Sequence, residues 1–237
     1  VANGAAAVMM SNFAPGFDAS LVRDPGVSAL AGAIDPAGAL TSGYGEARLV
    51  GSFLRVFQSQ LVRAAATSDV IECDDPDIRA LVRYGEKQAF LFLWDEAGTS
   101  GHQVRLSYTD PETEKTIAIP EAGAVYLPAG GAKILPLDMP IGRRSVRYCT
   151  SEVLSLHSVG ERTLLVLYGD PDTPGEIALR LPGPPLVIGD VARQKWDAET
   201  RTLTLDYYHG SADSYILVDE LEIAVLSRQR AAMADVI

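Results

Sequence analysis

The side chains that could perform chemistry are few, and their spacing fits no common catalytic or metal-binding motif. The three histidines are His102, His157 and His209, and none lies at metal-ligand spacing from another histidine or a cysteine. No G-x-S-x-G nucleophile elbow occurs in the sequence. Cys149 could pair with His157, but nothing nearby in the sequence would activate the thiol. We therefore expect each histidine to be structural.

Acidic residues gather in two turns that contain proline. They are Asp74, Asp75 and Asp77 in the first turn, and Asp170 and Asp172 in the second. Clustered carboxylates suit a calcium ion, yet the ligand interval and the glycine of an EF-hand loop are missing. Because aspartate beside proline is common in turns, we expect solvated turn residues here. The sequence predicts neither a metal nor a cofactor.

A glycoside hydrolase needs two carboxyl groups about 5 to 10 Å apart, one acting as general acid and the other as nucleophile or base. The acids available near the middle of the chain are Glu152, Glu161, Asp170 and Glu176. Their spacing gives no reason to pair any two of them. If the chain is itself a hydrolase, Glu152 is the best candidate.

Four aromatic residues could stack on sugar rings, because an aromatic face is a flat apolar platform with polar edges. Their alternation within predicted strands favours core packing for Trp94 and Trp196. Tyr207 and Tyr208 are adjacent in a predicted strand, so one of them must face outward. We take Tyr207 and Tyr208 as candidate substrate contacts.

Composition excludes several classes of function. The chain has 237 residues, 47% of them hydrophobic, which is enough for a proper core. A formal charge of -11 argues against nucleic acid or an anionic membrane as partner. No apolar run reaches the roughly 20 residues of a membrane-spanning helix. The start VANGAAAVMM lacks the basic region of a signal peptide, so it looks internal. Two reduced thiols, Cys73 and Cys149, are favoured over a single bridge.

Residues 44–63 have the clearest helical pattern. Leu49, Phe53 and Phe57 fall along one face, with arginine and serine on the other. We favour a core-facing helix, with a partner-binding helix as the alternative. Before it, residues 5–12 read as a buried strand or a helical turn. Residues 13–41 read as a long loop rich in glycine and proline, which indicates a larger parent structure.

From residue 70 onward the apolar period changes to two, which predicts a mainly β fold of short antiparallel strands packed as a sandwich or as several sheets. The central stretch 143–181 contains three apolar runs separated by glycine turns, and we expect an antiparallel meander there. The predicted strands are 78–84, 88–94, 103–108, 115–119, 124–127, 132–135, 153–159, 163–168, 176–181, 191–196, 202–208, 215–218 and 221–226.

Two segments resemble glycoside hydrolase family 35, the β-galactosidases. In the second domain of that family, a strand of the pattern Tyr, small, Ser/Thr, small, Glu is followed by a strand ending in V-L-Y-G. Here the first pattern is Tyr148 to Glu152, with Thr150 and Ser151 inside it, and the second is Leu165 to Gly169. Upstream, the run from Ala33 to Thr41 is similar to the family's passage from the last barrel strand to the last barrel helix.

The resemblance implies an antiparallel β domain preceded by one strand, loop and helix left over from a (β/α)8 barrel. Residues 1–66 would then be the end of the catalytic barrel, and residues 67–237 the β domain. In the family two glutamates on barrel strands perform catalysis, and both would precede Val1, so no residue here inherits either role. Family members usually carry Gly-Gly-Thr-Asn after the last barrel strand, whereas this chain has Ser-Asn-Phe-Ala-Pro-Gly at residues 11–16. Asn12 and Phe13 are the remaining candidate substrate contacts in that loop.

The resemblance favours the non-catalytic portion of a retaining β-galactosidase-like hydrolase, which meets a galactoside or another carbohydrate through its parent enzyme. The alternative is a stand-alone carbohydrate-binding or structural β module. If the barrel is absent, residues 44–63 would expose Leu49, Phe53 and Phe57, and we would expect association through this helix. By family resemblance the compartment would be periplasmic or extracellular, although no signal peptide is visible.

Overall fold

The computed structural model describes residues 33–34, 39–85, 88–111 and 113–234. This part of the chain is mainly β, with strands in four sheets and two helices. Neither helix has the length and apolar content needed to cross a bilayer. The elements in chain order are α1 (Ser42–Leu61), β1 (Ala65–Thr67), β2 (Ile71–Cys73), β3 (Ile78–Tyr84), β4 (Ala89–Asp95), β5 (His102–Val104), β6 (Leu106–Thr109), β7 (Thr116–Ile119), β8 (Val125–Leu127), β9 (Ala132–Ile141), β10 (Arg144–Cys149), β11 (Glu152–Val159), β12 (Arg162–Gly169), β13 (Pro174–Arg180), β14 (Val187–Gly189), β15 (Arg193–Asp197), β16 (Thr202–Tyr208), β17 (Ser214–Val218), β18 (Leu221–Ser227) and α2 (Arg228–Met233).

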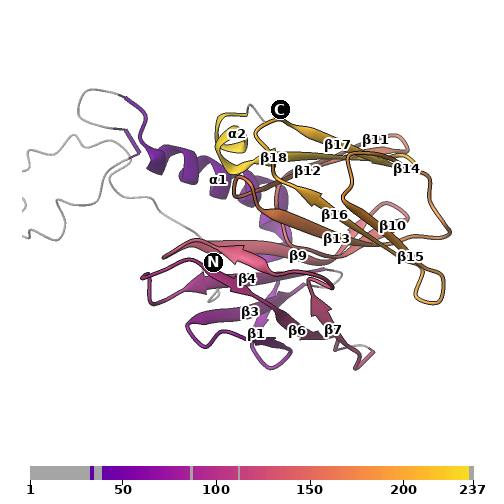
Figure 1. Cartoon of the computed structure of the whole chain (residues 1–237), viewed down its shortest axis with the longest axis horizontal. Coiled ribbons are helices and arrows are strands. Elements are labelled where there is room, and N and C mark those ends of the chain that lie inside the picture. The colour runs from indigo at the N-terminus through magenta and orange to yellow at the C-terminus, as the bar shows by residue number, and fades with distance from the viewer. Residues whose placement is uncertain (1–32, 35–38, 86–87, 112, 235–237) are drawn as a thin grey trace, which may run out of the picture.

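An eight-stranded sheet forms the middle layer of the molecule, in the order β1-β3-β4-β9-β10-β13-β16-β15. A five-stranded sheet, β11-β12-β18-β17-β14, packs on one of its faces. The small sheets β2-β6-β7 and β5-β8 cover part of the other face. Figure 1 shows the five-stranded sheet at the top and the β6–β7 hairpin at the bottom, with β4, β9, β10 and β13 of the large sheet between them.

Strand β4 shows why the large sheet lies between two cores. Successive side chains of a strand point to opposite faces, and almost every residue of β4 is buried. Phe90 and Phe92 enter the main core, which lies between the large sheet, the five-stranded sheet and α1. Leu91 and Leu93 enter the second core, under the small sheets. A strand buried on both faces therefore reads as a continuous apolar run.

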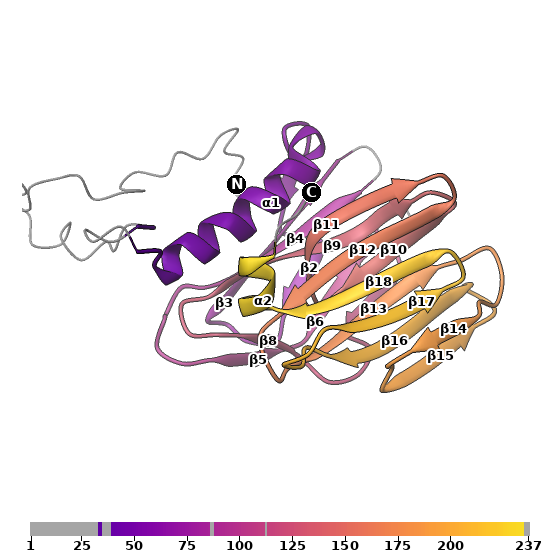
Figure 2. The ribbon, with the colours of Figure 1, turned by 90° about the horizontal axis from the view of Figure 1, so that it is seen from above.

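The predicted helix is present as α1, and its apolar face points into the main core. Phe53 and Phe57 are 4% and 2% exposed, and both rings contact Phe90 of β4 at centroid distances of 5.4 and 5.0 Å. Leu49 is buried in a smaller cluster with β11 and α2 residues. The expectation that residues 44–63 would expose Leu49, Phe53 and Phe57 is wrong, because this chain's own sheets and α2 cover them. Association through this helix stays a prediction. Figure 2 shows α1 alongside the sheets, close to α2.

The C-terminal end of α1 is fixed by a buried arginine from the β fold. Arg83 of β3 donates hydrogen bonds to the carbonyl oxygens of Leu61 at 2.9 Å and Ala64 at 2.6 Å. Carbonyls in the last turn of a helix have no intrahelical partner, and a cation there also meets the negative end of the helix dipole. Helix and sheet are therefore joined by polar as well as apolar contacts. The predicted division of the chain at residues 66 and 67 stays a prediction.

The predicted mainly β, antiparallel sandwich-like fold is confirmed, and strands such as β3 and β16 have the predicted bounds. The predicted meander at 143–181 is wrong in its last step. Strands β11 and β12 form the expected hairpin, but β13 lies in the large sheet between β10 and β16. The neighbour of β12 is β18, which runs parallel to it. The run predicted as one strand at 103–108 is also divided, into β5 and β6 of different sheets.

The predictions for residues 5–12 and for most of the loop 13–41 lie outside the described residues. Of that loop the structure describes Ala33, Ile34 and residues 39–41, where Ile34 and Leu40 form an isolated antiparallel bridge. Cys73 and Cys149 are free thiols. Burial raises the pKa of the Cys149 thiol to about 11, which makes it a poor nucleophile at neutral pH.

Candidate functional site

The Tyr148 to Glu152 stretch carries the chain from one sheet to the other. Strand β10 of the large sheet ends at Cys149 and strand β11 of the five-stranded sheet begins at Glu152. Between them, the Thr150 amide donates to the carbonyl of Glu176 at 2.9 Å, and the Glu176 amide donates to the Thr150 hydroxyl at 2.8 Å. The threonine side chain thus replaces a backbone acceptor where the strand leaves its sheet, so the motif forms a bend between two strands.

Glu152 lies in a buried cluster of charges. Its carboxylate accepts a hydrogen bond from Arg228 of α2 at 2.5 Å. Arg228 also reaches Asp170 at 3.2 Å and Glu46 of α1 at 2.7 Å, and Lys133 of β9 donates to Asp170 at 2.6 Å. Burial raises the pKa of Glu152, and the positive charges of Arg228 and Lys133 oppose that shift. The cluster joins both helices to β9, β11 and the end of β12, which is a structural role.

Ser151, within the same bend, forms a buried pair with His209. The Ser151 hydroxyl lies 2.8 Å from Nε2 of His209 and 2.7 Å from the hydroxyl of Tyr207. His209 Nδ1 lies 2.9 Å from the carbonyl oxygen of Thr173, so Nδ1 carries the proton and Nε2 accepts from Ser151. Burial lowers the pKa of His209 to about 4. In a catalytic triad Nδ1 of the histidine contacts a carboxylate, whereas here it contacts a backbone carbonyl. Ser151 and His209 are also only 1% and 2% exposed.

The imidazole ring of His209 also explains why the V-L-Y-G run ends in a glycine. A Cβ atom placed on Gly169 would lie 2.4 Å from Cε1 of His209. Gly175 of β13 is similarly confined, because a Cβ there would lie 2.4 Å from the Tyr207 ring. Both positions therefore need glycine for space, since no side chain fits between the backbone and these buried rings.

Glu176 organises the loop that follows β7. Its carboxylate accepts hydrogen bonds from the hydroxyl of Tyr148 at 2.8 Å and from the backbone amides of Glu121 at 2.5 Å and Ala122 at 3.2 Å. Arg193 of β15 donates to the same carboxylate at 3.1 Å. Burial raises the pKa of Glu176, and the hydrogen bond from Tyr148 opposes that shift. Glu176 thus holds residues 120–123 over the outer face of the large sheet.

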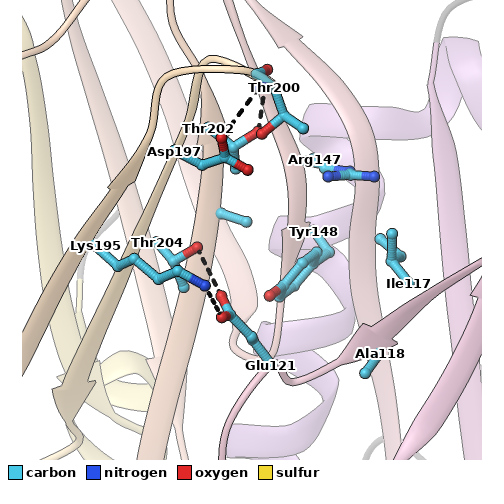
Figure 3. A pocket seen from close by; sticks show the side chains of 11 residues that line it. Ile117, Ala118, Glu121, Arg147, Tyr148, Lys195, Asp197, Thr200, Thr202 and Thr204 are labelled. Carbon is cyan, nitrogen blue, oxygen red and sulfur yellow. Dashed lines mark hydrogen bonds and ion pairs between the residues drawn. The ribbon is translucent and has the colours of Figure 1, made fainter.

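A cleft of about 240 Å³ opens beside this loop, between β7 and the outer face of the large sheet. Figure 3 shows Glu121 projecting from the loop toward Lys195 of β15 and Thr204 of β16, with Arg147 and Tyr148 of β10 on the other side of the cleft. The lining residues are mostly polar; they are Ile117, Ala118, Glu121, Arg147, Tyr148, Ala178, Lys195, Asp197, Thr200, Thr202 and Thr204. The cleft is one of several places where the described part of the chain presents hydroxyl, guanidinium and carboxylate groups together.

Comparison with known proteins identifies the family. The family model described as "Beta-galactosidase, domain 2" matches residues 62–233. The chain belongs to this family. The resemblance drawn from Tyr148 to Glu152 and from Leu165 to Gly169 is thereby confirmed, because both segments lie inside the matched residues.

Curated relatives of this β-galactosidase domain 2 are much longer proteins. A "Probable beta-galactosidase A" of Neosartorya fischeri is 23% identical over 193 residues, which cover 79% of this chain and 19% of that protein. A "Probable beta-galactosidase A" from each of two strains of Aspergillus fumigatus is 24% identical over 170 residues, covering 65% of this chain and 17% of the relative. The chain therefore spans about a fifth of the length of the curated relatives it matches.

The candidate sugar contacts of this β-galactosidase domain 2 fall in three different environments. Tyr207 is 1% exposed and leaves no ring face open to a ligand, whereas Tyr208 is 61% exposed at the end of β16. Trp94 and Trp196 are half-buried and pack against the main core, as their alternation predicted. The candidates in the loop at residues 12–13 lie outside the described part of the chain.

Asp75, in the acidic turn at residues 74–77, is hydrogen-bonded to His102. Asp75 lies 2.7 Å from Nδ1 of His102, and Asp95 lies 3.7 Å from Nε2 of the same ring. The hydrogen bond with Asp75 raises the pKa of His102 and lowers that of Asp75. Among the described residues no group of three or more histidine, cysteine, aspartate or glutamate side chains is arranged to hold a metal ion.

Proposed function

We propose that this β-galactosidase domain 2 is a non-catalytic support within a longer carbohydrate-hydrolysing protein that cleaves β-galactosides. The observation that carries the proposal is the family match over residues 62–233. In the proposal, the catalytic carboxyl pair lies outside residues 1–237, and the chain reaches its carbohydrate through the parent protein.

The buried acids support a structural role for this chain. A general acid and its partner must reach the substrate from an open site. Glu152 is 6% exposed and is paired with Arg228, and Glu176 is 3% exposed and is occupied by backbone amides and Arg193. Both carboxylates hold elements of the fold together, so we assign neither of them to catalysis.

Hydrolysis of p-nitrophenyl β-D-galactopyranoside tests the proposal. We expect the longer protein to release p-nitrophenol, and the 237-residue chain at equal concentration to release none. The Glu152→Gln variant of the longer protein separates support from catalysis, because its loss of activity should track its loss of folded protein. A longer protein that cleaves no β-galactoside would contradict the proposal. Turnover by the 237-residue chain that disappears in Glu152→Gln would assign catalysis to this chain instead.

We also propose that Tyr208, and not Tyr207, is the aromatic sugar contact of this chain. Tyr208 presents a ring to solvent, which is the requirement for stacking on a sugar face. Tyr208→Ala should weaken retention of the chain on immobilised galactoside, whereas Tyr215→Ala, which removes another exposed tyrosine, should not. Equal retention of the two variants would argue against this contact.

A further inference from the structure

The cleft beside residues 120–123 is built on one registered row of the large sheet. Tyr148 of β10 pairs with Ala178 of β13, Ala178 pairs with Thr204 of β16, and Thr204 pairs with Lys195 of β15. Residues directly opposite one another in neighbouring strands point to the same face of the sheet. Ala178 has the smallest side chain of this row, so it forms a floor between the larger side chains. The hollow is therefore a property of the sheet register.

A β-bulge aims an arginine into this hollow. The pairing of β10 with β13 shifts between Val146 and Tyr148, so that Arg147 is the extra residue on its strand. Arg147 and Tyr148 consequently both line the cleft, although they are neighbours in sequence. Bulges of this kind re-aim side chains next to binding sites. Within the described part of the chain, no hydrogen bond or ion pair engages the guanidinium of Arg147, although its charge interacts with that of Asp138. Figure 3 shows no bond between Arg147 and the other residues that line the cleft.

The other charged groups of the cleft already have partners. Glu121 accepts hydrogen bonds from Lys195 and, at 3.4 Å, from the hydroxyl of Thr204. Asp197 accepts backbone amides of Glu199 at 2.9 Å and Thr200 at 3.3 Å. A ligand would therefore meet threonine hydroxyls that donate within the chain and can still accept, carboxylates held by Lys195 or by backbone amides, and the guanidinium of Arg147 as donor. This mixture of donors and acceptors matches a ligand rich in hydroxyl groups better than a strongly charged one.

The size and lining of the cleft restrict the ligand further. Pockets for drug-sized molecules measure roughly 300 to 1,000 Å³ and are mostly apolar. This cleft, at about 240 Å³, is smaller and is lined mainly by polar side chains. We propose that it binds a single sugar ring, with Arg147 donating hydrogen bonds to the ring's oxygens and the Thr202 hydroxyl contacting the same ring. The proposal places a sugar-binding site on the β domain itself and does not depend on whether the parent protein hydrolyses galactosides.

Backbone amide shifts measured by NMR on the 237-residue chain test this site. Titration with D-galactose, and separately with D-glucose, should give saturable shifts at residues 117–122, 147–148 and 195–204, and any shift at Tyr208 should be unaffected by Arg147→Ala. Arg147→Ala should weaken the binding about tenfold, as expected for loss of hydrogen bonds from a charged donor. Arg147→Lys should recover part of the affinity, because the charge stays but the planar fork of donors is lost. Arg162→Ala removes an exposed arginine from the other sheet and is the matched control, with unchanged binding expected.

Sodium acetate provides the competing probe, because a simple anion site would bind a carboxylate through Arg147 alone. Shifts with acetate but none with either sugar would overturn the proposal. Absence of saturable shifts with both sugars would also overturn it, as would equal affinities of the wild type and Arg147→Ala. The amide spectrum of each variant shows directly whether the fold is retained, and Thr202→Val provides a second, nearly isosteric change that should also weaken the binding. The hydrolysis assay of the longer protein gives an independent result, so failure of one proposal does not imply failure of the other.

Discussion

Lowering the pH from 7 to 4 should destabilise the folded chain through His209. The ring is 2% exposed, donates from Nδ1 to the carbonyl of Thr173, and accepts from Ser151 at Nε2. Burial lowers its pKa from 6.5 to about 4. In the unfolded chain the imidazole is in water and titrates near its ordinary pKa of about 6.5. Between these two pKa values the unfolded state binds a proton that the folded state does not.

The sign and size of the effect follow from that difference. Stability rises with pH wherever the unfolded state holds more protons. The contribution of His209 is therefore fully present above pH 6.5 and is lost as the pH falls toward 4. The difference between the two pKa values corresponds to about 3 kcal/mol. Glu152 and Glu176 act in the opposite direction, because their folded pKa values are raised, so the pH dependence of the wild type alone is a sum of several groups.

A comparison of variants isolates the histidine. Urea unfolding at pH 7, 6, 5 and 4, followed by circular dichroism, gives the free energy of unfolding for the wild type and for His209→Gln. The wild type should lose about 3 kcal/mol more than His209→Gln between pH 7 and pH 4. His157→Gln, which removes an exposed histidine of β11, should behave as the wild type does. Equal pH dependence in the wild type and His209→Gln, or an NMR titration midpoint of His209 near 6.5, would refute the reasoning.

Two further predictions concern single buried contacts. Arg228→Ala should lower the free energy of unfolding by about 3–5 kcal/mol, because it leaves the Glu152 carboxylate buried without its cation; Arg230→Ala removes an arginine of the same helix from an exposed pair, and an equal loss in urea unfolding would contradict the assignment. Gly169→Ala should cost about 1–3 kcal/mol or more, because its methyl group would overlap the buried imidazole. Gly51→Ala in α1 is the control, because its added methyl group would meet no atom within 4 Å. It should raise the melting temperature, since alanine favours a helix over glycine by about 1 kcal/mol. A gain of stability in Gly169→Ala would rule out the steric explanation for that position.

Local sequence patterns predicted where most strands lie, but not which strands pair with one another. Alternation of apolar residues located β3 and β16, because one strand's periodicity depends only on its own two faces. The placement of β13 in the large sheet and the parallel pairing of β12 with β18 depend on contacts between distant segments. Periodicity carries no information about such contacts. The short elements β1, β2 and β14, three residues each, were missed, although β8 of the same length was predicted within 124–127.

The polar sites were harder to predict than the strands. Glu152 was singled out from the sequence as a candidate acid, but its partner Arg228 is 76 residues away and belongs to a helix of six residues that the sequence pattern did not indicate. The cleft depends on a bulge at Arg147, and a bulge changes the pairing register without changing the local composition. The exposure of one member of the Tyr207 and Tyr208 pair was predictable, because a strand alternates its faces; which of them faces outward was not.

The contact between Arg83 and the end of α1 shows that the core extends beyond the matched family segment. The matched family segment begins at residue 62, one position after α1 ends at Leu61. A chain that began at residue 62 would keep the whole matched segment, yet it would lose the Leu61 carbonyl that the buried guanidinium needs. It would also remove Phe53 and Phe57 and leave Phe90 open to water. The matched family segment at residues 62–233 is thus shorter than the segment that this core needs in order to close.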